Sequence, residues 1–201
     1  MNLSKGPRML PEKFQRKYSI VLADPPWSYT DKAAAGKRGA SFKYTTIVYN
    51  DLLGLQPLIN HITEENCALF LWTTGPMMDA ALGLMEFWDY KYKTVAFTWR
   101  KENPKTKKLF FGMGNYTRAN EEFVLLGMRG RLDRVSAGVR CSITAPNTGH
   151  SCKPPEVRDR IVQLFGDIPR IELFARDKAP GWEATGLEFD KINILKYEAA
   201  K

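Results

Sequence analysis

The chain has 201 residues, enough for one domain that buries a sizeable core without a metal or disulfide staple. Its three cysteines lack paired or metal-finger spacing and no run approaches about 18 apolar residues, which argues against a disulfide-rich secreted protein and a membrane span. The net charge of +8 favours a polyanionic partner. We therefore expect a cytoplasmic protein with no membrane partner.

Strands and helices are predicted to alternate along the chain. Buried strands are expected at 19–23, 67–73, 92–99, 122–128 and 170–175, where branched and aromatic residues form short apolar runs. Helical spacing of apolar residues appears at 77–89 and 154–166. This alternation predicts an α/β fold with a mainly parallel twisted sheet, helices on both faces, and ligands beyond the carboxyl ends of the strands.

The predicted elements lie in one domain over 1–201, with flexible residues at 1–15. Two long connections remain, at 28–50 and 100–118. Connections of this length in a compact domain are usually functional or disordered, so both are expected to be functional loops. The first mixes small, basic and aromatic residues, a composition that suits a lid over a pocket.

The first strand, SIVLA, ends abruptly in Asp24, Pro25, Pro26 and Trp27. The prolines hold the backbone extended and have no N–H, so the turn presents acceptors beside an indole. An aromatic amine whose two hydrogens are accepted by Asp24 and the Pro25 carbonyl could aim its lone pair at an electrophile, while Trp27 fixes the ring plane. Alternatively, Asp-Pro-Pro simply ends the strand.

ADPPW after an apolar strand resembles the catalytic motif of the MT-A70 family of adenine methyltransferases. The blocks CALFLWTTGPMMDAALGLMEFW, YKTVAFTWRK, KLFFGMGNYTRANEEFVLLG, HSCKPPEV and RIELFARDKAPGW follow in the family's order, and the phage and prophage DNA enzymes are the closest likeness. The resemblance implies a Rossmann-like methyltransferase fold, the cofactor S-adenosylmethionine, and methylation of the N6 amino group of adenine in DNA. It also implies a catalytic strand early and a main cofactor strand late in the chain.

The resemblance assigns roles to individual residues. The catalytic loop would be Asp24, Pro25, Pro26 and Trp27, with Asp24 also near the methionine end of the cofactor. The remaining cofactor contacts would be Asn120, with Glu122 as a second candidate, Glu172 at the ribose, Phe174 and Arg176 beside the adenosine, and Gly186 and Glu188 closing over it. For Glu172, an ion pair with Arg170 or Arg176 is an equally simple interpretation.

The substrate side rests on loops. The family carries a basic residue at Lys153, and Arg131 and Arg134 lie in an arginine-dense segment that suits phosphate or guanine contact, or is simply solvated. Tyr29 and Tyr44 could hold a flipped adenine or pack within a lid.

Several alternatives stay open at this point. One is adenine methylation in RNA, another a non-catalytic nucleic-acid-binding subunit, and a third methylation of a protein amide. The two histidines have no companion ligands, so no metal site is expected, and the sequence allows a homodimer.

Overall fold

The computed structural model describes residues 11–27, 48–112, 114, 116–148, 152–186, 189–192 and 194–196. The strands are β1 (Tyr18–Ala23), β2 (Thr63–Thr73), β3 (Lys91–Glu102), β4 (Glu121–Arg129), β5 (Ser142–Pro146), β6 (Arg170–Leu173) and β7 (Glu183–Thr185). The α-helices are α2 (Tyr49–Leu53), α3 (Gln56–Ile62), α4 (Met78–Phe87) and α5 (Glu156–Phe165), and short 3-10 turns are η1 (Glu12–Gln15), η2 (Gly75–Met77) and η3 (Ile194–Lys196). In these residues we find no helix with the length and apolar character needed to span a membrane.

All seven strands belong to one sheet, in the order β5-β3-β4-β2-β1-β6-β7. Only β4 runs antiparallel to its neighbours β2 and β3, and every other pairing is parallel. Six strands therefore end at one edge of the sheet, which we call the carboxyl edge, and β4 begins there. The predicted mainly parallel α/β sheet is confirmed.

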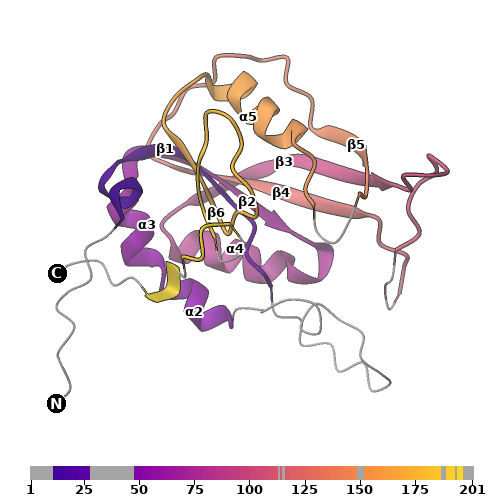
Figure 1. Cartoon of the computed structure of the whole chain (residues 1–201), viewed down its shortest axis with the longest axis horizontal. Coiled ribbons are helices and arrows are strands. Elements are labelled where there is room, and N and C mark those ends of the chain that lie inside the picture. The colour runs from indigo at the N-terminus through magenta and orange to yellow at the C-terminus, as the bar shows by residue number, and fades with distance from the viewer. Residues whose placement is uncertain are drawn as a thin grey trace.

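Each face of the sheet carries its own apolar core, as strand alternation requires. On one face, Val21 of β1 and Leu69 of β2 pack with residues of α2, α3 and α4. On the other, Leu22 and Phe70 pack with Val157 and the rest of the apolar stripe of α5. Figure 1 shows α4 and α5 on opposite sides of the sheet, so the prediction of helices on both faces is also confirmed.

The observed elements differ from the predicted ones mainly at their ends. β3 continues through Glu102, so the connection to β4 spans 103–120 rather than 100–118, and α2 begins at Tyr49 within the connection expected at 28–50. β6 stops at Leu173 because Phe174 adopts a left-handed backbone with φ of 62°. At the N-terminus, η1 buries Phe14 completely, so part of the segment expected to be flexible packs against the core.

Candidate functional site

The loop after β1 lies at the carboxyl edge and is held by hydrogen bonds to both neighbouring strands. The Asp24 amide donates to the Leu173 carbonyl of β6 at 3.4 Å, and the Trp27 indole Nε1 donates to the Trp72 carbonyl of β2 at 3.0 Å. The Trp27 amide also donates to the Pro25 carbonyl at 2.8 Å, which leaves that oxygen one further lone pair. The turn that presents Asp24 is therefore fixed from three directions.

Trp27 packs in the core beneath this loop. Its side chain is 6% exposed and lies in the core cluster on the α4 side of the sheet. Little of the ring is accessible to a ligand, so the structure assigns Trp27 an anchoring contact. It does not show the open stacking face that the sequence interpretation used.

Asp24 belongs to a chain of alternating charges at the carboxyl edge. Its Oδ2 lies 2.8 Å from Lys153 Nζ, which is 3.3 Å from Glu122 Oε2, and Glu122 Oε1 pairs with Lys101. The side chains of Asp24, Lys153 and Glu122 are 20%, 16% and 14% exposed, so this network is largely shielded from water. Shielded opposite charges interact more strongly than surface pairs.

Burial and the alternating charges shift the pKa values in this network. Burial raises the pKa of Asp24, and the nearby Lys153 cation opposes that shift. Burial acts in the same direction on Glu122, but Lys153 and Lys101 outweigh it and lower the pKa of that carboxyl. Lys153 is buried as well, yet Asp24 and Glu122 raise its pKa to about 12. Lys153 therefore stays charged, and its charge limits how far burial raises the pKa of Asp24.

Two tryptophans support the lysines of this network. Lys153 Nζ lies 5.2 Å from the Trp72 ring centroid and Lys101 Nζ lies 4.9 Å from that of Trp99. The two indoles meet edge to face with centroids 6.3 Å apart. Cations over indole faces gain electrostatic stabilisation, so the aromatic pair favours both lysines in their charged form.

Glu172 forms a second charged cluster on β6, next to Asp24. It pairs with Leu22 in the β1–β6 register, one residue before the end of both strands. Arg158 of α5 binds its carboxylate through two bonds, Nε to Oε2 at 2.6 Å and Nη2 to Oε1 at 3.1 Å, and also reaches Asp177 at 2.7 Å. Arg158 is therefore an ion-pair partner of Glu172 that the sequence interpretation did not name.

The environment of Glu172 is acidic as well as buried. Burial raises the pKa of Glu172, Arg158 opposes the shift, and the charge of Asp24 adds to it. At Asp24, burial raises the pKa, and Arg176 adds a small opposition to that rise beside Lys153. Asp24, Glu172 and Arg176 therefore share one electrostatic environment at the ends of β1 and β6.

The turn after β7 packs directly on the end of β6. A Cβ built on Gly186 would lie 2.2 Å from the Ala175 carbonyl oxygen and 2.8 Å from the Phe174 carbonyl carbon, so only glycine fits there. The Ala175 amide donates to the Thr185 carbonyl at 2.9 Å, which closes the contact. Gly186 thus has a packing reason for being glycine, and it fixes the backbone around the left-handed Phe174.

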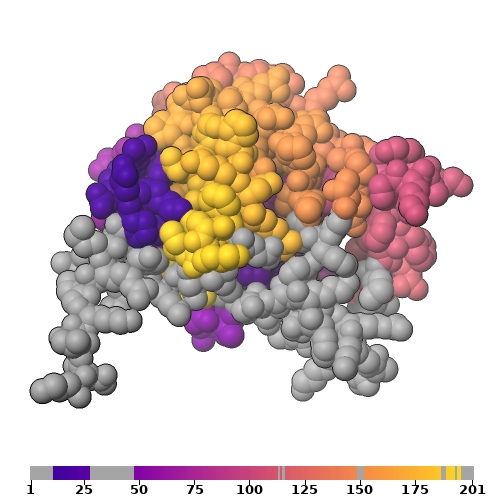
Figure 2. Space-filling model, viewed as in Figure 1, coloured from indigo at the N-terminus to yellow at the C-terminus, as the bar shows by residue number. Residues whose placement is uncertain are grey.

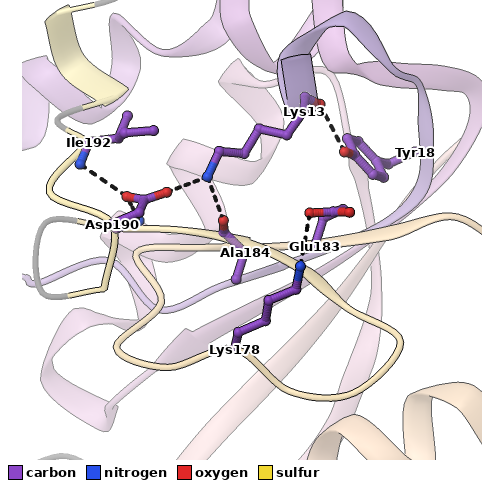
Figure 3. Close-up of polar contacts among 8 residues, drawn as sticks. Lys13, Tyr18, Lys178, Glu183, Ala184, Asp190 and Ile192 are labelled. Carbon is purple, nitrogen blue, oxygen red and sulfur yellow. Dashed lines mark hydrogen bonds and ion pairs between the residues drawn. The ribbon is translucent and has the colours of Figure 1, made fainter. Parts of the chain in front are cut away.

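A lysine from the N-terminal turn clamps the segment after Gly186 (Figure 3). Lys13 Nζ pairs with Asp190 Oδ2 and donates to the Ala184 carbonyl at 2.9 Å. Asp190 Oδ1 accepts from the amides of Gly186 at 3.2 Å and Ile192 at 3.0 Å. Burial raises the pKa of Asp190, but Lys13 and these amides outweigh it and lower the pKa of the carboxyl. One carboxylate therefore ties η1 to the turn at the end of β7.

The remaining predicted residues fall in different places. Asn120 precedes β4 at the carboxyl edge, where its carbonyl accepts from the Lys101 amide at 3.0 Å. Arg131 and Arg134 follow the end of β4, at the opposite edge of the sheet from Asp24, so the structure does not bring them to this site. Tyr29, Tyr44 and Glu188 lie outside the described residues.

Lys101 belongs to the Asp24 network and Arg158 to the Glu172 cluster, but neither was singled out as a site residue in the sequence. Glu122 comes to the site because β4 runs antiparallel and begins at the carboxyl edge, and strand direction cannot be deduced from an apolar run.

The carboxyl edge offers groups that match those of S-adenosylmethionine. The cofactor carries a ribose diol, an ammonium and a carboxylate, and the edge carries two carboxylates, Asp24 and Glu172, with Arg176 nearby. A carboxylate has about four lone-pair sites, so Glu172 can bind Arg158 and still accept from a diol. In the described part of the chain, no three His, Cys, Asp or Glu side chains gather in a way that could hold a metal ion.

Comparison with known proteins gives consistent matches. The family model MT-A70 matches residues 18–188. The type II methyltransferase M.MunI of Mycoplasma sp is 36% identical, over 92% of this chain and 84% of that protein. The N(6)-adenosine-methyltransferase subunit METTL3 of Danio rerio is 27% identical over 90% of this chain, as is the catalytic subunit METTL3 of Homo sapiens over 89%, but the matches span only 30% and 29% of those longer proteins.

Proposed function

Because this chain belongs to the MT-A70 family, we propose that it is an S-adenosylmethionine-dependent methyltransferase that modifies the N6 amino group of adenine in DNA. The observation that carries this proposal is the largely buried Asp24 at the end of β1, held by Lys153 and adjacent to the Glu172 cluster. It combines an acceptor for an amine with polar groups for the cofactor on neighbouring strands.

Asp24 acts by positioning the amine. Its Oδ2 faces Lys153, so we assign Oδ1 to accept one N6 hydrogen, while the second lone pair of the Pro25 carbonyl accepts the other. Both hydrogen bonds pull the amine out of conjugation with the ring and direct its lone pair. S-adenosylmethionine, when bound, would supply an electrophilic methyl group on a positively charged sulfur; as the N–C bond forms, the S–C bond breaks and S-adenosylhomocysteine is the product.

Burial also prepares Asp24 for the proton that the methylated amine must lose. A carboxylate whose pKa is raised by burial is a better proton acceptor than one in water. Lys153 keeps this carboxylate ionised before the reaction, so Asp24 can accept hydrogen bonds first and hold the proton at Oδ1 afterwards. Glu172, Arg176, Asn120, Phe174 and Gly186 are assigned to the cofactor, and Glu188 stays a prediction.

The coverage of the relatives favours DNA over RNA as the substrate of this chain. M.MunI is a type II methyltransferase matched over most of its length, whereas the METTL3 proteins, named for adenosine methylation, match over less than a third of theirs. A duplex hides the adenine amino group, so the base must be flipped out at a cost of about a few kcal/mol. We place the protein in the cytoplasm of a bacterial or phage-infected cell; a homodimer stays a prediction.

The test is methyl transfer from labelled S-adenosylmethionine to unmethylated duplex DNA, single-stranded DNA and RNA at one salt concentration, with the modified nucleoside identified by mass spectrometry. We expect label on N6 of adenine in DNA. Asp24→Ala should lower kcat by about 10²–10³-fold or more while cofactor binding persists, and Asp133→Asn, which changes an exposed carboxylate far along the chain, should behave as wild type. Methyl label found only in RNA would show that the assignment of DNA as the substrate is wrong. Full activity of Asp24→Ala would show that the mechanism proposed for Asp24 is wrong.

A further inference from the structure

We propose that the described part of the connection between β3 and β4, residues 103–112, 114 and 116–120, is a preformed arm that grips duplex DNA beside the site; this inference rests on the proposed function. We call this segment the β3–β4 arm. Figures 1 and 2 show it projecting from the body of the protein beyond the end of β5. Its tip lysines would contact phosphates, and its exposed aromatic rings would contact bases or sugars.

The first half of the arm is a built turn that displays three lysines. Asn103 Oδ1 accepts from the amides of Lys105 at 2.9 Å and Thr106 at 3.1 Å, and the Asn103 amide donates to the Lys108 carbonyl at 2.8 Å. Lys107 takes a left-handed conformation with φ of 58°, which closes the turn. Lys105, Lys107 and Lys108 are all exposed, so the turn holds three cations apart from the body of the protein.

The second half of the arm is pinched by glycines and presents aromatic rings. A Cβ on Gly112 would lie 1.5 Å from the Ala119 carbonyl oxygen, so the two sides of the loop approach at a distance that only glycine allows. Tyr116, between Gly112 and Ala119, is 103% exposed. Phe111, just before Gly112, is 76% exposed, with the Arg118 guanidinium 5.3 Å from its ring centroid. Large exposed rings on a basic segment indicate a binding surface.

The base of the arm connects to the charge network of the site. The Phe110 amide donates to the Lys101 carbonyl at 2.8 Å, and the Lys101 amide donates to the Asn120 carbonyl at 3.0 Å. Lys101 pairs with Glu122, which is joined to Asp24 through Lys153. DNA with a base at Asp24 would therefore lie beside the arm.

The composition of the arm selects the partner. Residues 103–120 contain four Lys and Arg and no Asp or Glu. Phosphates attract such a segment, and sequence-tolerant stacking on Phe and Tyr rings is a common way to contact bases. The phosphate backbone of DNA matches the lysines, and the bases next to a flipped-out adenine expose ring faces that the aromatic side chains can stack on; DNA is also the polyanion that the proposed reaction requires.

The test compares two triple variants that remove equal charge. Lys105, Lys107 and Lys108 are changed to Gln together in the arm, and Lys17, Lys91 and Lys93, exposed lysines before β1 and at the start of β3 on the opposite edge, are changed to Gln as the control. Affinity for one unmethylated duplex is measured against salt concentration, together with binding of S-adenosylhomocysteine. The arm variant should reduce the slope of log affinity against log salt by about 2.7, since each phosphate contact contributes about 0.9.

The control variant should change that slope by much less, and both should bind S-adenosylhomocysteine like wild type. If the slope changes equally in the two variants, or does not change in the arm variant, the proposal that the arm contacts DNA is wrong. Phe111→Ala with Tyr116→Ala provides a second measurement, with an expected loss of about 5- to 150-fold in DNA affinity for each stacked ring removed.

The outcomes separate this inference from the proposed function. Loss of DNA binding in the arm variant, in a protein that transfers no methyl group to DNA, would support the arm and overturn the function. If the arm variant methylates DNA normally and its slope of log affinity against log salt equals that of wild type, the function is supported and the arm is overturned. If sedimentation shows instead that the arm variant changes only self-association, the arm is an interface between copies of the chain and the inference is wrong.

Discussion

Replacement of Lys153 by Met should move the acid limb of the pH–rate profile to higher pH. The reaction needs ionised Asp24, so activity is lost as pH falls through the pKa of that carboxyl. The Lys153 cation lies 2.8 Å from Asp24 Oδ2 and opposes the rise in pKa that burial causes. Without it the pKa of Asp24 rises further, and the pH at which activity is lost rises with it.

The size of this shift can be worked from the distance. Two unit charges at 2.8 Å interact by about 6 kcal/mol at an effective dielectric constant of about 20. The cost of burying both groups offsets part of this, and a cation beside a carboxyl typically changes its pKa by about 1–3 units. We therefore expect the acid limb to move upward by about 1–3 pH units, equivalent to about 1.4–4 kcal/mol.

The assay is the single-turnover rate of methyl transfer to duplex DNA across pH, with cofactor and DNA saturating. Lys101→Met is the matched control, because Lys101 pairs with Glu122 but not with Asp24. It removes one cation from the same network and should shift the limb far less. Superimposable acid limbs for Lys153→Met and wild type would refute the reasoning, as would a shift to lower pH.

Two further changes test the supports of the site. Lys13→Met should weaken cofactor binding about tenfold, equivalent to about 1.4 kcal/mol, because the ion pair of Lys13 with Asp190 holds the turn after β7. The kcat should not change, and Lys13→Arg should restore the cofactor affinity. Lys178→Met is the control, because it breaks only the exposed pair with Glu183 at 3.6 Å and should leave cofactor affinity unchanged. If calorimetry shows the same loss of cofactor affinity in Lys178→Met and Lys13→Met, the clamp is contradicted. Trp27→Phe removes the hydrogen bond to the Trp72 carbonyl, so it should lower the free energy of unfolding by about 1 kcal/mol and reduce kcat. Denaturant unfolding and turnover measurements check the two effects. If neither value changes, Trp27 does not anchor the loop.

The elements that the sequence predicted well are those with long apolar patterns. The helices expected at 77–89 and 154–166 are α4 at Met78–Phe87 and α5 at Glu156–Phe165, and the first strand is correct within one residue. The edge strands β5 and β7 were missed because five and three residues show no readable periodicity. The polar starts and ends of β2 and β3 were missed because they extend past the core.

The amino-acid sequence was enough to find the Asp24-Pro25-Pro26-Trp27 motif, the family resemblance and a carboxylate at the end of the first strand. The surroundings of that carboxylate depend on how distant segments pack. β4 runs against the other strands, so Glu122 lies at the carboxyl edge. Lys153, shortly before α5, lies at the same place. Distances between residues about 130 positions apart depend on strand order and direction, which local patterns of apolar residues do not encode.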